Sequence, residues 1–370
     1  MCFGRTKEML SLTCRCLTPF FYVGLSQTKS MLQSSTIAFA QTFFNQKVDK
    51  FLPLSASGSN RKYYRLFLSD GQTYILTEND FVAENQTFFY LSQLFAGHSF
   101  AVPDILAVND SQTAYIQQDL GDLSLLMILE QEGFTDRVLA LYEQSLKQLA
   151  QLQIRLKKKI DFKKCYDFNQ FDEKVVYNDL FYFKNFFLDR LDIPYQKGRL
   201  INDFERLAQQ INDLKQDFFL FRDFQSRNIM VRQNDVFFID YQGGMSGFVG
   251  YDLASLLFQA KAQLPQAWKA HLKTVYCQPF KDNDLLSEDT LNRGCQMGLI
   301  LRVFQVFGAY GLRGLIEGKP HFLSSIRLNM NNIKYVLEQN YLQDFPYLNT
   351  IAQKLISENT QEKIKQILQV

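Results

Sequence analysis

The chain has 370 residues, of which 46% are hydrophobic and 21% charged, which excludes global disorder and allows two or three domains. Lys and Arg total 40 against 38 Asp and Glu, which argues against a dedicated nucleic-acid-binding protein because such proteins usually carry a basic excess. The six cysteines form no Cys-x-x-Cys pair, and only three histidines are present. We therefore expect neither a structural zinc site nor a disulfide framework, and a reduced cytoplasmic protein fits best.

Residues 1–30 differ in character from the rest of the chain. The apolar run over residues 17–25 is too short to span a bilayer. A signal peptide is the alternative, but Arg15 interrupts its apolar region and no small-residue cleavage site follows. We expect an extra, poorly ordered segment, with Met31 as an alternative start. No other segment reaches membrane-spanning length, so no membrane association is expected.

Residues 35–118 predict a small domain built on an antiparallel sheet. The apolar spacing predicts a helix over 37–44. Strands follow over 52–59, 63–68 and 73–76, and Asp70-Gly71 marks a hairpin between the last two. A helix over 81–95 and a strand pair over 102–108 and 113–117 complete five strands.

Residues 119–370 predict a larger, mainly helical domain. Apolar residues recur at helical spacing over 123–132, 135–158, 172–191, 199–216, 251–262 and 292–316. A single island of strand is predicted at 236–239, and the tail over 349–370 is predicted to be one amphipathic helix. The fold class is therefore α+β, with a small sheet-based N-terminal part and a larger helical C-terminal part.

The densest polar cluster of the chain lies between two apolar runs. Residues 222–228 read Arg-Asp-Phe-Gln-Ser-Arg-Asn between apolar 218–221 and 229–231, where unpaired polar groups would cost a few kcal/mol each. Asp240 follows the next apolar strand. Magnesium-assisted phosphoryl transfer needs this order, with Asp223 as the base and Asn228 and Asp240 as metal ligands. Taken alone, the Arg-Asp pair could equally be an ion pair and the Asn a turn residue.

Five separated sequence words carry a resemblance to a known family. Residues 221–228 resemble the kinase catalytic loop His-Arg-Asp-x₄-Asn, and residues 240–242 resemble the following Asp-Phe-Gly metal site. The details are closest to the aminoglycoside phosphotransferase-like family, and within it to the branch that phosphorylates N-acetylmuramate and N-acetylglucosamine at the anomeric hydroxyl. The five words are the loop at 221–228, Ile-Asp-Tyr-Gln-Gly-Gly at 239–244, residues 251–257, Gln-Asp-Leu-Gly-Asp at 118–122, and residues 302–308 with 318–320. The resemblance covers about residues 35–340.

This resemblance implies a two-lobed, protein-kinase-like fold with ATP and Mg²⁺ in the cleft. It makes Asp223 the catalytic base and Asn228 and Asp240 the metal ligands. Arg222 and Asp252 would support the catalytic loop, although Asp252 could also be a plain helix cap. The hinge whose backbone groups pair with adenine would be Gln118, Asp119 and Leu120.

The phosphate end of the cleft departs from the kinase pattern. Ser57, Gly58 and Ser59 occupy the place of the phosphate-covering turn, where small residues let backbone N–H groups approach phosphate. An ordinary hairpin turn explains them equally well. Arg61 and Lys62 follow, as phosphate-binding cations or as a solvated strand edge.

Two residues of the protein-kinase pattern are replaced in this chain, and the resembling sugar-kinase branch also lacks the second of them, the strand Lys. Phe221 stands where kinases usually place His, and we expect it to support the loop by packing. The strand over 73–77 lacks the phosphate-binding Lys. Glu84 is either the partner of that missing Lys or a solvent-facing carboxylate. Phosphate charge must then be met by Mg²⁺, Arg61, Lys62 or backbone amides.

The acceptor is expected to be a small molecule in the helical lobe. Asp172 and Asp179 lie among aromatic residues, as in many sugar sites, although an aromatic core stripe with an acidic outer face explains them as well. Arg302 would contact an anionic group or form a helix-end ion pair. The sequence thus predicts an ATP- and Mg²⁺-dependent kinase for an amino-sugar hydroxyl. The alternatives are a nucleotide-binding regulator without catalysis, a kinase for an aminoglycoside or choline, and a protein kinase. The oligomeric state is not indicated.

Overall fold

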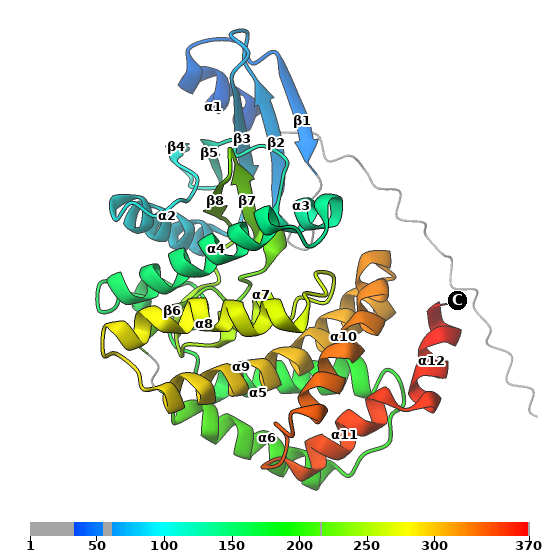
Figure 1. The fold of residues 1–370 in the computed structure, drawn as a ribbon. Coiled ribbons are helices and arrows are strands. Elements are labelled where there is room, and N and C mark those ends of the chain that lie inside the picture. The colour runs from blue at the N-terminus through cyan, green and yellow to red at the C-terminus, as the bar shows by residue number, and fades with distance from the viewer. Residues whose placement is uncertain (1–32, 55–60, 215–216, 369–370) are drawn as a thin grey trace, which may run out of the picture.

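The computed structural model describes residues 33–54, 61–214 and 217–368. The predictions made for residues 1–30 and for Ser57, Gly58 and Ser59 therefore concern residues outside the described part of the chain. The described residues form two lobes, a sheet-based one and a helical one, stacked along the long axis of the molecule (Figure 1).

The first lobe is a five-stranded antiparallel sheet with strand order β1-β2-β3-β5-β4. The elements are α1 (Ser34–Phe44), β1 (Lys50–Leu54), β2 (Lys62–Phe67), β3 (Thr73–Glu78), α2 (Val82–Gly97), β4 (Ile105–Val108) and β5 (Ala114–Gln118). All five predicted strands and both helices are present. Gly71 has φ +82° at the predicted Asp-Gly hairpin, a conformation that glycine adopts readily.

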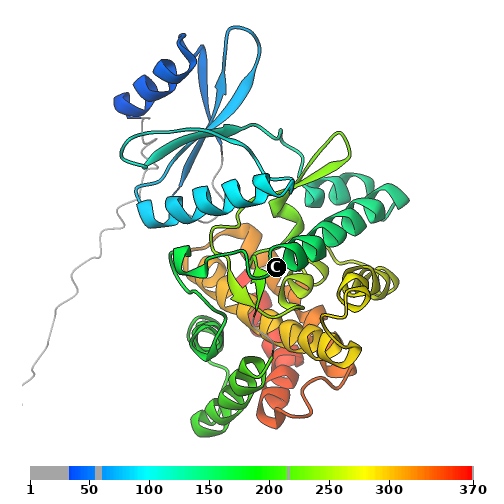
Figure 2. The same cartoon turned by 90° about the vertical axis from the view of Figure 1, so that its left-hand side faces the viewer.

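Helix α2 runs beneath the sheet, toward the second lobe (Figure 2). Its buried residues Phe88, Leu91 and Phe95 belong to a core cluster that also contains Tyr115 of β5 and Phe221 of the second lobe. One hydrophobic core therefore continues from the first lobe into the second, which fixes the position of α2 above the catalytic loop.

The second lobe is mainly helical. Its α-helices are α3 (Leu125–Glu132), α4 (Asp136–Arg155), α5 (Glu173–Phe183), α6 (Lys197–Asn212), α7 (Tyr251–Leu257), α8 (Gln266–Asp282), α9 (Glu288–Ala309), α10 (Pro320–Glu338), α11 (Pro346–Ile356) and α12 (Glu358–Leu368). A short 3₁₀ turn lies at Phe162–Lys164, and π-helical turns at Lys184–Leu188 and Tyr310–Ile316 extend α5 and α9. The predicted helix over 251–262 ends earlier, at Leu257, and α8 and α10 were not predicted.

The prediction of a single strand island in this lobe was wrong. Two short ribbons are present, β6 (Phe218–Leu220) with β9 (Met245–Gly247), and β7 (Ile229–Arg232) with β8 (Asp235–Phe238). A separate 3₁₀ turn, Ser226–Asn228, joins the loop to β7. Strands β6 and β9 have three residues each, all buried, so they show no alternating pattern. Strands β7 and β8 have only four residues each. The ribbons hold the two ends of the catalytic loop.

The predicted single tail helix is two helices. Ser357 separates α11 from α12 with extended backbone angles, φ −66° and ψ 152°. Its hydroxyl accepts the N–H of Thr360 in the first turn of α12. Serine favours such a position because its oxygen satisfies a free N–H at a helix start.

One described helical stretch, Glu288–Ile316, is long and apolar enough to cross a membrane, with mean hydropathy 1.4. This differs from the expectation that no segment reaches that length. Length and composition do not separate a membrane span from a buried core helix. Here Met297, Ile300 and Phe304 are fully buried in the second lobe, and this packing accounts for the apolar composition.

Candidate active site

A cavity of about 590 Å³ lies between the two lobes. Its N-terminal wall comes from β2 and from the segment that follows β5, and its floor from the catalytic loop and the residues after β8. The lining includes Arg61, Tyr63, Arg65, Gln118, Asp119, Leu120, Asp223, Asn228 and Asp240. A cavity of this size suits a nucleotide-sized ligand. The structure therefore brings most of the predicted nucleotide and catalytic residues to one place.

The catalytic loop is held from below by Asp252 of α7. Its Oδ2 accepts the backbone N–H of Phe221 at 2.7 Å, and its Oδ1 accepts that of Arg222 at 3.1 Å. Burial raises the pKa of Asp252 to about 7, although these two N–H groups oppose the rise. The N-cap of α7 is Gly250, so the structure gives Asp252 the supporting role rather than the capping one.

Two residues of the site have unusual backbone angles. Arg222 has φ +75° and Asp240 has φ +64°, values that cost non-glycine residues about 1–3 kcal/mol and often mark functional positions. Arg222 is fixed by a bidentate contact, since its Nη1 and Nη2 donate to the Asp179 carboxylate at 2.9 and 3.0 Å. The next residue, Asp223, lines the cavity.

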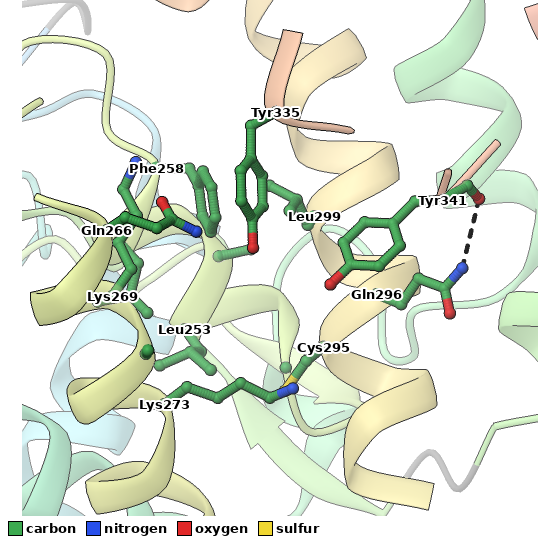
Figure 3. Close-up of a pocket in the computed structure, with 14 residues that line it drawn as sticks. Leu253, Phe258, Gln266, Lys269, Lys273, Cys295, Gln296, Leu299, Tyr335 and Tyr341 are labelled. Atoms are coloured by element: carbon green, nitrogen blue, oxygen red, sulfur yellow. Dashed lines mark hydrogen bonds between the residues drawn. The ribbon is translucent and has the colours of Figure 1, made fainter. Parts of the chain in front are cut away.

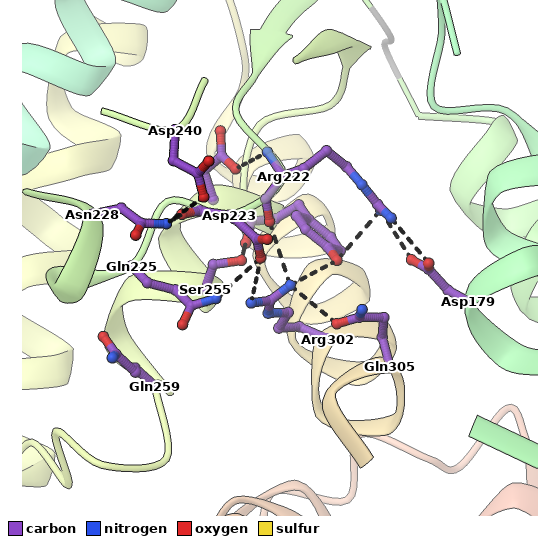
Figure 4. Close-up of polar contacts among 12 residues, drawn as sticks. Asp179, Arg222, Asp223, Gln225, Asn228, Asp240, Ser255, Gln259, Arg302 and Gln305 are labelled. Carbon is purple, nitrogen blue, oxygen red and sulfur yellow. Dashed lines mark hydrogen bonds and ion pairs between the residues drawn. The ribbon is translucent and has the colours of Figure 1, made fainter. Parts of the chain in front are cut away.

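Asp223 lines the cavity, and its side chain is 47% exposed. Figure 4 shows its polar contacts. Its Oδ1 accepts from Arg302 Nη2 at 3.0 Å and from Gln225 Nε2 at 3.0 Å. Its Oδ2 accepts no hydrogen bond from a described residue and faces the cavity. Loss of solvent around the carboxylate would raise the pKa of Asp223, but the positive charges of Arg302, Arg227 and Arg222 hold this pKa below its ordinary value. The group is thus an ionised carboxylate with one free oxygen.

Asn228 and Asp240 lie beside Asp223. The Asn228 Nδ2 donates to the Asp223 carbonyl at 2.9 Å and to Asp240 Oδ2 at 3.2 Å, and Asn228 lines the cavity. Gln242 Nε2 donates to Asp240 Oδ1 at 2.8 Å. Among the described residues no group of three or more His, Cys, Asp or Glu could hold a metal ion. One carboxylate and one amide oxygen suit Mg²⁺, which takes further ligands from phosphate and water.

Arg61 supplies a buried cation at the phosphate end of the cavity. Its guanidinium pairs with both oxygens of Glu84 on α2, at 2.5 and 3.1 Å, with side chains 5% and 15% exposed. It also lies 3.7 Å from Asp240 Oδ1. Glu84 is therefore not solvent-facing; its partner is Arg61 at the start of β2 rather than a Lys on β3. Lys62 does not line the cavity, because neighbouring residues of a strand point to opposite faces.

The predicted hinge is tied to β2 by a residue that the sequence analysis missed. Arg65 Nε lies 2.6 Å from Asp119 Oδ2, and Arg65 Nη1 lies 2.7 Å from Asp122 Oδ1. Alternation places Arg61, just before β2, on the same face as Tyr63 and Arg65, and this signal could have identified Tyr63 and Arg65, which the sequence analysis missed. The Gln117 Oε1 is buried at the cavity and has no hydrogen-bond partner among the described residues, so it is available to a bound donor.

Phe221 supports the loop by packing, as expected. Its ring contacts those of Phe219, Phe224 and Phe238, with centroids 5.0–5.6 Å apart in edge-on geometry. Tyr241 follows Asp240 and stacks on Phe88 of α2 at 5.1 Å. Such aromatic contacts contribute about 0.5–1.5 kcal/mol each beyond burial, so they hold the strained loop in place.

The three predicted acceptor residues do not form one pocket. Asp172 caps α5, accepting the N–H groups of Lys174 and Val175, and it does not line the cavity. Asp179 is buried and paired with Arg222. Arg302 is buried, and its ion pair is with the carboxylate of Asp223 rather than with a residue at a helix end.

Comparison with known proteins decides the family. A family model described as "Phosphotransferase enzyme family" (APH) matches residues 50–285. The chain belongs to this family. The match spans the sheet, residues 221–228 and Asp240, which are parts of the chain that line the cavity between the lobes.

Similar proteins and similar structures agree with this family assignment. An N-acetylmuramate/N-acetylglucosamine kinase of Pseudomonas aeruginosa is 25% identical over 289 residues, covering 75% of this chain and 80% of the relative. A choline kinase from Cryptosporidium parvum has a TM-score of 0.58 at 12% identity, covering 85% and 98% of the two chains. The ADP-bound aminoglycoside phosphotransferase APH(2″)-Ib has a TM-score of 0.52 at 14% identity, and the match covers 81% of this chain and 97% of that one. The predicted two-lobed kinase-like fold is confirmed, and the protein is a small-molecule kinase.

Proposed function

We propose that this APH-family kinase transfers the γ-phosphate of ATP to a hydroxyl of an amino sugar, with Asp223 as the base. The observation that carries the proposal is the convergence of Asp223, Asn228 and Asp240 on the floor of one 590 Å³ cavity. Their order and spacing are those of Mg²⁺-assisted phosphoryl transfer.

The reaction needs little covalent chemistry from the protein. The free Oδ2 of Asp223 orients the acceptor hydroxyl and accepts its proton as the new O–P bond forms and the β–γ bond breaks, so that ADP leaves. Because Arg302 holds the pKa of Asp223 low, the carboxylate is ionised before the acceptor binds, and it takes the proton late, from an oxygen that already bears phosphorus. Mg²⁺, held by Asn228 and Asp240, would offset charge on the phosphates.

The charges near Asp223 support a neutral or anionic acceptor over a cationic one. Arg227 lines the cavity, makes no ion pair with a described carboxylate, and has a buried Nε without a hydrogen-bond partner. The nearby Asp179 is neutralised by Arg222. A polycationic aminoglycoside would meet repulsion here, whereas a sugar with or without a carboxylate would not. The Pseudomonas relative, named for N-acetylmuramate and N-acetylglucosamine, fits this environment.

The test is ATP consumption by the purified protein with Mg²⁺. The acceptors are N-acetylglucosamine, N-acetylmuramate, kanamycin and choline. The methyl glycoside of N-acetylglucosamine serves as the matched control, since its anomeric hydroxyl is blocked. We expect turnover with one or both free amino sugars and none with the methyl glycoside.

Turnover with the methyl glycoside equal to that with the free sugar would place transfer at another hydroxyl. Turnover only with kanamycin or choline would overturn the amino-sugar proposal and leave the phosphotransferase assignment intact.

A further inference from the structure

A second cavity of about 230 Å³ lies in the helical lobe, between α7, α8, α9 and the end of α10 (Figure 3). None of its lining residues lines the cavity between the lobes. The mechanism proposed above uses none of them. The cavity is therefore a separate site, and its lining indicates what it would bind.

The lining carries positive charge that no lining residue neutralises. Lys269 and Lys273 belong to it, and no Asp or Glu does. Lys273 donates to the neutral Asn292 Oδ1 at 2.7 Å. Lys269 makes no ion pair with a described carboxylate, and its Nζ lies 4.5 Å from the Phe258 ring centre. Burial lowers the pKa of Lys269, as expected for a cation that lacks an anionic partner.

The remaining walls are flat and apolar. The rings of Phe258 and Tyr335 stand side by side, with centroids 5.2 Å apart. Tyr341 meets Tyr335 edge-on at 6.3 Å, and Leu299 closes the side formed by α9. A planar ring packs well against such walls, and an anionic group on that ring would reach the ammonium groups at the rim.

The cavity also adjoins the two helices that hold the catalytic loop. Leu253 of its lining is next to Asp252, which accepts the backbone N–H groups of Phe221 and Arg222. Leu299 lies one helical turn before Arg302, which pairs with Asp223. A ligand in the cavity would therefore contact α7 and α9, the two helices that carry Asp252 and Arg302.

We propose that this cavity is an effector site for a small organic anion with a planar ring, coupled to the catalytic loop through α7 and α9. The class of ligand follows from two unneutralised lysines beside aromatic walls. The coupling follows from the shared helices, because allostery requires that a ligand bias an element which the active site also uses.

The binding test uses benzoate as the probe and benzamide, which has the same ring without the charge, as the matched control. Affinity is measured by ligand-observed NMR titration of the full chain. We expect benzoate to bind at least about tenfold more tightly than benzamide, since hydrogen bonds to charged groups contribute that much or more. Lys269→Gln with Lys273→Gln should remove this advantage, whereas Lys334→Gln, at an exposed lysine next to Tyr335, should keep it.

Urea unfolding checks that the variant with both lysine substitutions folds. If that variant does not fold, the Lys273→Gln single variant is used in its place. Any of three results would overturn the site: equal affinities for benzoate and benzamide, unchanged benzoate affinity in the lysine variants, or displacement of benzoate by excess Mg-ATP.

The coupling is tested by the affinity for Mg-ATP with and without saturating benzoate, where a difference of at least about fivefold is expected. Identical affinities would overturn the effector role. These readouts are binding constants, so they do not depend on the acceptor proposed above.

Discussion

Arg302 and Asp223 form the contact on which the chemistry of the site most depends. Arg302 is the strongest of the three arginines that lower the pKa of Asp223. Arg302→Gln should raise that pKa, because the carboxylate loses a close cationic partner. Asp223 acts in its ionised form, so activity is lost as the pH falls through its pKa. The acid limb of kcat/KM against pH should therefore move to higher pH.

The control is Arg190→Gln, because Arg190 is exposed and lies outside the cavity. Its pH profile should match that of the unmodified protein. If Arg302→Gln lowers kcat/KM equally at every pH and leaves the acid limb in place, Arg302 has only a structural role.

Arg61 is expected to replace the missing strand lysine. It is buried, paired with Glu84 and 3.7 Å from Asp240, where nucleotide phosphates would meet it. Arg61→Met should raise KM for Mg-ATP by about tenfold or more, since a charge-assisted contact contributes about 1.5–3 kcal/mol. Arg61→Lys should keep part of the effect. Steady-state kinetics at varied ATP would check this, and an unchanged KM in Arg61→Met would show that other groups bind the phosphates.

At the scale of elements, α7 and α9 approach each other through glycines. A Cβ on Gly294 would lie 2.2 Å from the Val249 carbonyl oxygen, a distance that forces the backbones apart. Gly294→Ala should therefore lower the free energy of unfolding by about 1–3 kcal/mol. Gly198, in α6, has nothing within 4 Å of its Cβ position, and Gly198→Ala should be neutral or stabilising by up to about 1 kcal/mol.

Urea unfolding of both variants measures this difference. Equal urea midpoints for the two variants would mean that α7 and α9 can move apart at little cost in free energy. In that case Asp252 and Arg302 would not be held by close helix packing.

The elements also show where sequence patterns suffice. The five strands of the first lobe were predictable because hairpin cues and apolar runs separate them. Strands β6 and β9 were not predictable, because three consecutive buried residues show no alternation of apolar and polar side chains. The tail was misread because the extended backbone at Ser357 interrupts a continuous amphipathic pattern. Local periodicity thus predicts long elements and fails where tertiary contacts define short ones.

The same limit applies to the site. Asp223, Asn228 and Asp240 lie within one short stretch of chain, so their spacing predicts their convergence. Arg302 is 79 residues from Asp223, and Arg61 is 23 residues from Glu84. Such pairs depend on how helices and strands pack, and spacing does not reveal them. Spacing also did not reveal that Asp172, Asp179 and Arg302 serve three different local contacts.

At the scale of the whole molecule, the nucleotide should join the two lobes. A ligand that binds only the folded protein stabilises it by about 2.7 kcal/mol at 100 times its Kd. Mg-ATP should therefore raise the unfolding temperature, and EDTA should remove most of the shift, because Asn228 and Asp240 would hold the metal. Asp240→Asn should lose the Mg²⁺-dependent part as well. Thermal unfolding with ATP alone, Mg-ATP, and Mg-ATP plus EDTA checks this, and equal shifts in all three would contradict a metal site here.

The central claim, that Asp223 is the base of a phosphotransferase, is tested most directly by the turnover number of Asp223→Asn with Mg-ATP and the best acceptor. Asp110→Asn, at an exposed carboxylate in the turn between β4 and β5, is the matched control. We predict a fall in kcat of about 10²–10⁴ for Asp223→Asn and no change for Asp110→Asn. A near-normal kcat in Asp223→Asn would contradict the assignment.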